Sequence, residues 1–131
     1  MTIFVDTSAL FALLDVGDEN HRRAASALRS LRESGRPLLT HSYAIVEASA
    51  LAQRRLAADA QRVLFQDLLP VLEVTSVEPS LHAAGVAALL ASPSAPSLVD
   101  EVSFALMRER GIRTAFAFDA DFAKAGFTVV P

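Results

Sequence analysis

The chain has 131 residues, of which 52% are hydrophobic and 21% charged, so it is long and apolar enough to fold as a globular domain. It contains no cysteine, which excludes disulfides, thiolate nucleophiles and Cys-type metal sites. Its net charge of −3 provides no overall basic field of the kind that nucleic-acid-binding proteins often carry. We expect a single domain over residues 1–131, soluble and cytoplasmic, with no signal peptide and no membrane span.

Short apolar runs alternate with helical patterns along the whole chain. The first run, at residues 2–5, predicts a strand, and it is followed by residue types that begin helices, Asp6, Thr7 and Ser8. Further strands are predicted at residues 37–40, 71–75, 115–118 and 127–130. Helices are predicted before the polar residues 15–20, between residues 20 and 35, and over residues 42–55, 59–69, 78–90 and 97–110, with a last helical turn at 119–125.

The predicted strands have no hairpin-turn signals between them, so they are expected to be parallel and joined by helices. Short, continuously apolar strands of this kind are typical of a sheet that is covered on both faces. The pattern therefore predicts an α/β protein, a three-layer α/β/α sandwich with a mainly parallel five-stranded sheet. The Pro- and Ser-rich residues 92–96 are interpreted as a loop within this domain.

Three aspartates occupy positions where a parallel sheet builds its sites. Asp6 directly follows the first predicted strand, Asp119 directly follows the fourth, and Asp100 lies in the first turn of the helix after the 92–96 loop. Sites in open parallel sheets form at the carboxyl ends of strands, so all three side chains can reach one edge. Each also has an ordinary explanation, because aspartate is a preferred capping residue, and Ser97-x-x-Asp100 resembles a capping box.

Glu47 is not explained by capping. It lies in the middle of the helix predicted over residues 42–55, its neighbours three and four positions away are largely apolar, and no basic residue lies within four positions. A solvated position remains one interpretation. If the carboxylate instead faces inward, it needs a partner, because removing a charge from water without one is costly. A bound cation would be such a partner.

Together, the acidic candidates form a set of oxygen ligands with no thiol or clustered histidine: Asp6, Glu47, Asp100 and Asp119. Such a set favours a hard cation, Mg²⁺ or Mn²⁺, over zinc. Four carboxylates can support one or two ions, and a pair about 3.5–4 Å apart stabilises the attacking and leaving oxygens in phosphodiester hydrolysis. Chemistry of this kind requires no catalytic Ser, Cys or His.

Four segments carry these acids and match the motifs of a known family. They are Phe4-Val5-Asp6-Thr7-Ser8-Ala9-Leu10, then Ser42-x-x-x-x-Glu47, then Ser97-Leu98-Val99-Asp100, and last Phe118-Asp119-Ala120-Asp121-Phe122 with Gly126-Phe127. In order and spacing they resemble the four motifs of PIN domains. The resemblance covers essentially the whole chain, and although each motif alone is weak, the four in register are specific.

The resemblance implies a Mg²⁺- or Mn²⁺-dependent ribonuclease with a parallel five-stranded sheet. Many small bacterial PIN proteins are toxins of type II toxin–antitoxin pairs (the VapC group), so the resemblance also implies a homodimer and a small antitoxin partner. By position, Asp6 and Asp100 would be the principal metal ligands, and Glu47 and Asp119 would complete the catalytic group directly or through water. Ser8 would support Asp6 or a water on the metal, and Asp121 is a secondary candidate ligand.

Contacts to an RNA substrate would come mainly from arginines, since eleven of the twelve basic residues are Arg and the other is Lys124. The candidates are Arg22, Arg23, Arg54, Arg55 and Arg62. The ordinary interpretation is favoured for them, as solvated helix faces whose side-chain stems cover apolar surface. Two histidines and four phenylalanines are interpreted as packing and core residues: His21, His41, Phe104, Phe116, Phe118 and Phe122.

Two other functions are open on the sequence. A catalytically inactive PIN-like domain would bind RNA or protein without cutting, and the presence of all four acidic positions argues against it. Aspartyl-phosphate chemistry, as in haloacid-dehalogenase-like phosphatases and receiver domains, also places an Asp after the first strand. The phosphatases require a second Asp where this chain has Ser8, and both classes require a suitably placed Lys, whereas Lys124 lies near the C-terminus.

Overall fold

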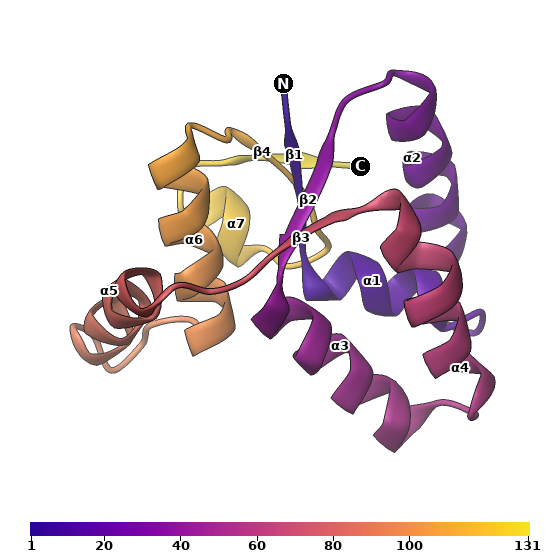
Figure 1. The fold of residues 1–131 in the computed structure, drawn as a ribbon, viewed down its shortest axis with the longest axis horizontal. Coiled ribbons are helices and arrows are strands. Elements are labelled where there is room, and N and C mark those ends of the chain that lie inside the picture. Colours follow the sequence, from indigo (N-terminus) through magenta and orange to yellow (C-terminus); the bar gives the residue numbers. More distant parts are fainter.

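The computed structural model describes all residues, 1–131, and places a parallel sheet between two layers of helices (Figure 1). The strands are β1 (Ile3–Val5), β2 (Leu38–His41), β3 (Glu73–Thr75), β4 (Thr114–Phe116) and β5 (Thr128–Val130). The helices are α1 (Thr7–Leu14), α2 (His21–Glu33), α3 (Ser42–Arg55), α4 (Asp59–Arg62), α5 (Pro79–Leu90), α6 (Leu98–Arg110) and α7 (Asp121–Lys124). Every strand pairing is parallel, which confirms the predicted α/β/α sandwich with a five-stranded sheet.

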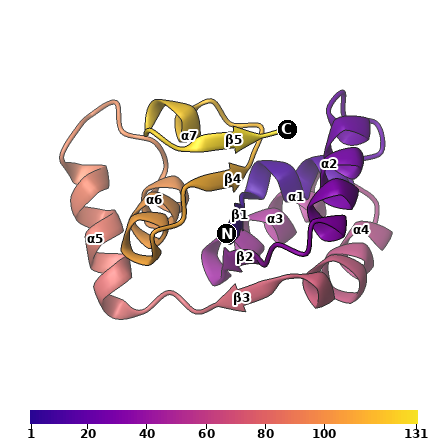
Figure 2. The same ribbon diagram turned by 90° about the horizontal axis from the view of Figure 1, so that it is seen from above.

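The strand order determines where the sheet can build a site. The order is β3-β2-β1-β4-β5, which Figure 2 shows along the sheet. The chain adds β2 and β3 on one side of β1 and then crosses over to add β4 and β5 on the other side. The direction of winding therefore reverses between β1 and β4. In an open parallel sheet, the carboxyl ends of the two strands at such a reversal border the crevice that holds the ligand.

The strands separate two hydrophobic cores. Ile3 and Val5 of β1 belong to the core that α1, α2, α3 and α4 cover, whereas Phe4 between them belongs to the core under α5, α6 and α7. Figure 1 shows the same division, with α1–α4 on one face of the sheet and α5–α7 on the other. Burial on both faces explains why the strands are continuously apolar in sequence. None of the helices combines the length and the hydrophobicity needed to cross a bilayer.

Two predicted boundaries were wrong in ways that affect the architecture. The helix predicted over residues 59–69 is α4 followed by a π-helical stretch, Val63–Leu68, and a single 3₁₀ turn, Leu69–Val71, which contains Pro70. This turn delays the next strand, so β3 begins at Glu73.

The fourth strand also ends earlier than predicted. β4 stops at Phe116, and Asp119 therefore does not directly follow the strand but lies three residues beyond it, in the connection to α7. This connection is still anchored to the sheet, because the Ala117 N–H donates to the Val130 carbonyl. The result is a short loop that carries Asp119 over the end of the sheet.

Candidate metal centre

The three predicted aspartates meet at the reversal point of the sheet. One carboxylate oxygen each from Asp6, Asp100 and Asp119 lies within 4.8 Å of the others. Asp6 follows β1, Asp119 lies in the connection after β4, and Asp100 reaches the same place from the first turn of α6. Residues that are 94 and 113 positions apart from Asp6 are thus brought into one cluster by the crossover of the sheet.

Asp6 has one oxygen that caps a helix and one that has no protein partner. It is the N-cap of α1, and its Oδ2 accepts hydrogen bonds from the Ser8 N–H at 3.0 Å and the Ser8 hydroxyl at 2.6 Å. Its Oδ1 is buried and accepts no hydrogen bond. A buried carboxylate oxygen without a partner is costly, so capping accounts for only half of this side chain.

Ser8 joins the first aspartate to the loop of the last one. Its hydroxyl group donates to Asp6 Oδ2 and accepts from the Phe118 N–H at 2.9 Å. The residue after Phe118 is Asp119, so a single hydroxyl group fixes the relative position of two members of the cluster. The resemblance predicted a supporting role for Ser8, and the structure shows the contacts through which it supports Asp6.

Asp119 is oriented in turn by the start of α7. Its Oδ1 accepts from the Asp121 N–H at 2.9 Å, and the Asp121 carboxylate lies 4.0 Å from the ammonium of Lys124. The Lys124 side chain is 76% exposed and pairs with Asp121, not with a member of the cluster. Lysine is therefore not placed for aspartyl-phosphate chemistry.

Glu47 lies at the edge of the cluster rather than inside it. It is half-buried on α3, and it is not among the carboxylates that lie within 4.8 Å of one another. Its negative charge nevertheless contributes to the raised pKa of Asp100. The fully solvated interpretation of Glu47 is thus excluded, and its position fits a contact to the cluster through water.

The cluster is electrostatically strained in the absence of a cation. Burial raises the pKa of Asp6 from 3.8 to about 6, and the charge of Asp119 adds to the rise, while the hydrogen bonds from Ser8 oppose it. Burial raises the pKa of Asp100 from 3.8 to about 8, and the charges of neighbouring acids add to it: Asp6, Asp119, Glu47 and Asp121. At neutral pH the cluster therefore requires a proton or a cation.

The chain itself supplies no such cation. The one ion pair in the structure joins Lys124 and Asp121, so no arginine pairs with the cluster. The donors are all carboxylate oxygens, and one of them, Asp6 Oδ1, is buried without a partner. This donor set fits Mg²⁺ or Mn²⁺, which take oxygen ligands and a small number of carboxylates per ion.

His41 is a packing residue, as predicted. His41 is fully buried, and its Nδ1 accepts the Ala44 N–H, so it caps α3. In the neutral ring Nε2 then carries the proton and donates to the Ser103 hydroxyl at 2.8 Å, which donates to the Val99 carbonyl. Burial lowers the pKa of His41 from 6.5 to about 4, which keeps the ring neutral. His41 thus links α3 to α6, the helix that carries Asp100. The sequence gives no signal for this link except that a polar residue lies at the end of a buried strand.

Among the predicted core residues, Phe118 differs. Phe104, Phe116 and Phe122 are buried, but Phe118 is only half-buried, and the guanidinium of Arg23 lies 5.5 Å from the centre of its ring. Sequence reasoning favoured an ordinary role for Arg23 because nothing in the sequence relates α2 to the β4–α7 loop.

The arginines of α3 and α4 do not share this location. Arg54 and Arg55 lie in the last turn of α3, two helical turns beyond Glu47, and Arg62 is exposed at the end of α4. The guanidinium of Arg55 lies 5.9 Å from the Phe11 ring centre, so its stem covers apolar surface as expected.

The chain belongs to the PIN domain family. The PIN domain family profile matches residues 3–128, which include the three clustered aspartates and Glu47. The resemblance of the four motifs is thereby confirmed over nearly the whole chain.

Two relatives and several solved structures are similar to the chain over almost its full length. The 23S rRNA-specific endonuclease VapC20 of Mycobacterium tuberculosis, from strains CDC 1551 / Oshkosh and H37Rv, is 36% identical over 135 residues, covering 98% of this chain and 97% of the relative. The crystal structure of M. tuberculosis VapC20, described as a sarcin–ricin loop cleaving toxin, matches with a TM-score of 0.84 and 35% identity, covering 98% of this chain and 99% of that one. FitAcB from Neisseria gonorrhoeae matches with a TM-score of 0.70 at 16% identity, covering 100% and 97% of the chains, a likeness of fold alone.

Proposed function

We propose that this protein is a divalent-metal-dependent endoribonuclease that hydrolyses RNA phosphodiester bonds. The observation that carries the proposal is the cluster of Asp6, Asp100 and Asp119, whose carboxylate oxygens lie within 4.8 Å of one another with no basic side chain to pair them. The likeness to VapC20, an endonuclease specific for 23S rRNA, supports RNA as the substrate class.

Each acidic residue has a distinct part in this proposal. Asp6 and Asp100 would hold Mg²⁺ or Mn²⁺ as principal ligands, with Asp119 completing the group and Glu47 acting through water. A bound cation supplies Lewis-acid stabilisation of the charge that develops on the phosphate and lowers the pKa of water. Ser8 keeps Asp6 and the Asp119 loop in register through its two hydrogen bonds. Asp121 orients Asp119 through its backbone N–H.

The biological setting follows from the same likeness. VapC20 is described as a toxin that cleaves the sarcin–ricin loop, so we propose the toxin role, with this loop of 23S rRNA as the first substrate to test. A cytoplasmic enzyme that cuts ribosomal RNA harms its own cell unless it is restrained. We therefore propose a small antitoxin partner, and a homodimer as the functional unit.

The test is cleavage of defined RNAs by purified protein. We expect 23S rRNA to be cut in Mg²⁺ or Mn²⁺ and to remain intact in EDTA. Asp6→Asn and Asp100→Asn should abolish cleavage, whereas Glu109→Gln, on the exposed side of α6, should leave it unchanged. If the folded parent protein, with Mg²⁺ or Mn²⁺ present, cuts none of 23S rRNA, 16S rRNA and tRNA, the protein is instead an inactive binding domain. Light scattering of the protein, alone and co-expressed with the proposed antitoxin, measures the oligomeric state.

A further inference from the structure

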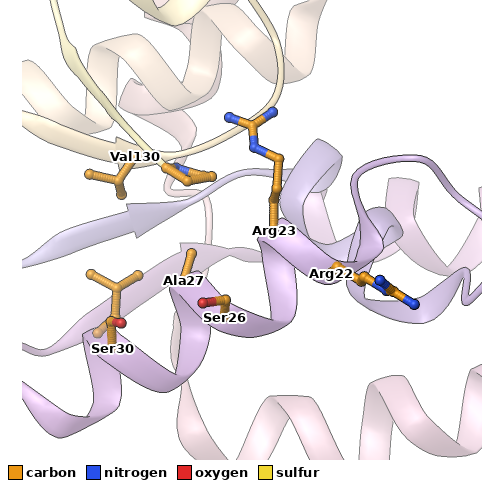
Figure 3. A pocket seen from close by; sticks show the side chains of 8 residues that line it. Arg22, Arg23, Ser26, Ala27, Ser30 and Val130 are labelled. Carbon is orange, nitrogen blue, oxygen red and sulfur yellow. The ribbon is translucent and has the colours of Figure 1, made fainter.

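A groove lies between α2 and the C-terminal strand, β5. It has a volume of about 520 Å³ and lies between one side of α2 and the end of β5. Its lining residues are Arg22, Arg23, Ser26, Ala27, Ser30, Leu31, Val130 and Pro131. Figure 3 shows Arg23 extending from α2 toward the C-terminal segment, while Arg22 takes a different direction.

Arg23 connects this groove to the cluster. Together with Pro131 it also lines a smaller hollow of about 230 Å³, to which Phe118 and Asp119 contribute. The groove and the hollow therefore share two lining residues, Arg23 and Pro131. The hollow is also lined by Asp119, a member of the acidic cluster. A strand that passes through both would cross Arg23 on its way to Asp119.

The guanidinium of Arg23 is held in place without being neutralised. It lies over the Phe118 ring at 5.5 Å, and one of its amino groups donates to Asn20 Oδ1 at 3.4 Å. No carboxylate lies within 4.0 Å of it. Arginine has five N–H donors in a planar fork, so most of them remain available to a ligand. The contact with Phe118 restricts the guanidinium and so reduces the entropy lost when an anion binds.

The polar side chains of the groove favour an anion with many acceptor oxygens, and the rest of its surface is apolar, from Ala27, Leu31, Val130 and Pro131. The lining contains two arginines and two serine hydroxyls and no acidic residue, although the chain as a whole is acidic. An RNA strand also needs such a cation close to the cluster, because its phosphates would otherwise meet several carboxylates. Bidentate contacts from arginine to phosphate are among the strong charge-assisted hydrogen bonds.

We propose that Arg23 binds a phosphate next to the scissile one and that the RNA strand continues from the acidic cluster into the α2–β5 groove. This inference rests on the proposed function, since it names how the substrate of that site is held. Arg23 contacts substrate and sets its register, and it does not take part in the bond-breaking step. Ser26 and Ser30 supply hydroxyl donors farther along the same strand.

The experiment separates binding from cleavage. The probe is a fluorescein-labelled RNA stem-loop with the sarcin–ricin sequence, and its anisotropy is measured in the Asp100→Asn background, where no cleavage is expected. Arg23→Ala is compared with Arg29→Ala, an exposed arginine on the same helix that does not line the groove, and with Arg23→Lys. Cleavage kinetics are measured on the same arginine variants with Asp100 intact.

We expect Arg23→Ala to weaken binding about tenfold, as for the loss of one charge-assisted hydrogen-bonded contact. The slope of log Kd against log salt should fall by about 0.7–0.9. KM should rise, whereas kcat should stay within about twofold of the parent value, because Arg23 binds the ground state and the transition state equally. Arg29→Ala should match the parent, and Arg23→Lys should restore the salt slope with only part of the affinity.

Three results would overturn the inference. One is equal RNA binding by Arg23→Ala and Arg29→Ala. Another is a fall in kcat together with weaker Mn²⁺ binding by Arg23→Ala, because Arg23 would then act only by supporting Asp119. The third is unchanged RNA binding with a weakened antitoxin complex, which would make the groove a protein site. Failure of the parent to cut any RNA, with Arg23-dependent binding intact, would instead overturn the proposed function.

Discussion

Neutralising Asp100 should stabilise the metal-free protein. The pKa of this carboxyl group is about 8 in the folded protein against an ordinary value of 3.8, so the folded state holds a proton that the unfolded chain releases. Stability therefore falls as pH rises between these two values. One pKa unit corresponds to about 1.4 kcal/mol, and about three units separate 3.8 from pH 7, which gives about 4 kcal/mol. Because Asp100 is partly exposed, solvent screening reduces this to about 2 kcal/mol.

The assay is thermal unfolding of parent, Asp100→Asn and Glu109→Gln in EDTA between pH 4 and pH 8. Asp100→Asn should unfold about 7 °C higher than the parent at pH 7, given the unfolding entropy of a chain of this length. The gain should become small near pH 4, where the folded carboxyl group is protonated and the unfolded one is about half protonated, and it should vanish below that pH. Glu109→Gln should stay within about 0.5 kcal/mol of the parent at every pH, as an exposed substitution.

Metal should reverse the order of stability. At about 100 times its Kd, Mn²⁺ should stabilise the parent by about 2.7 kcal/mol and should stabilise Asp100→Asn much less. If Asp100 merely capped α6, the substitution would lower stability or leave it unchanged at pH 7, and its effect would not depend on pH. Either outcome would refute the idea that repulsion among the clustered acids is relieved by an ion.

Three further substitutions test the framework around the cluster. His41→Asn should remove a loss of stability on acidification. The pKa of His41 is about 4 in the folded protein and ordinarily 6.5, so between these values the unfolded chain binds a proton that the folded protein does not. In denaturant titrations the parent should therefore lose about 3 kcal/mol of unfolding free energy over that pH range relative to the variant. Gly85→Ala places a methyl group 2.5 Å from Val102 Cγ2 at the buried α5–α6 contact and should cost about 1–2 kcal/mol of unfolding free energy despite the better helix propensity of Ala; an unchanged midpoint would contradict this packing. Ser8→Ala removes both hydrogen bonds of its hydroxyl group and should lower the free energy of unfolding by about 1–3 kcal/mol. It should also weaken Mn²⁺ binding in calorimetry. Equal Mn²⁺ affinity would show that the hydroxyl group does not organise the site.

Local patterns determined the class of fold and the residue types of the candidate site. Continuous apolar runs separated by helical patterns predict a covered parallel sheet, because strands buried on both faces cannot alternate polar and apolar residues. The acidic residues could be identified as candidates from local patterns as well. Glu47 within an apolar helix surface and an Asp after a buried strand both place a negative charge where it needs a partner. Boundaries were less well determined, and β4 ended two residues early because strand pairing, and not apolar character, decides where a strand stops.

Only the tertiary structure decided which acids meet and what surrounds them. The crossover from β3 to β4 brings Asp100 and Asp119 to Asp6 and leaves Glu47 outside this cluster, a distinction that no local pattern encodes. The same holds for contacts made by single side chains across long sequence separations, such as Ser8 with Phe118 and Arg23 over the Phe118 ring. Sequence periodicity reports which face of an element is buried, whereas the partner on that face depends on the order of the strands and the packing of the helices over them.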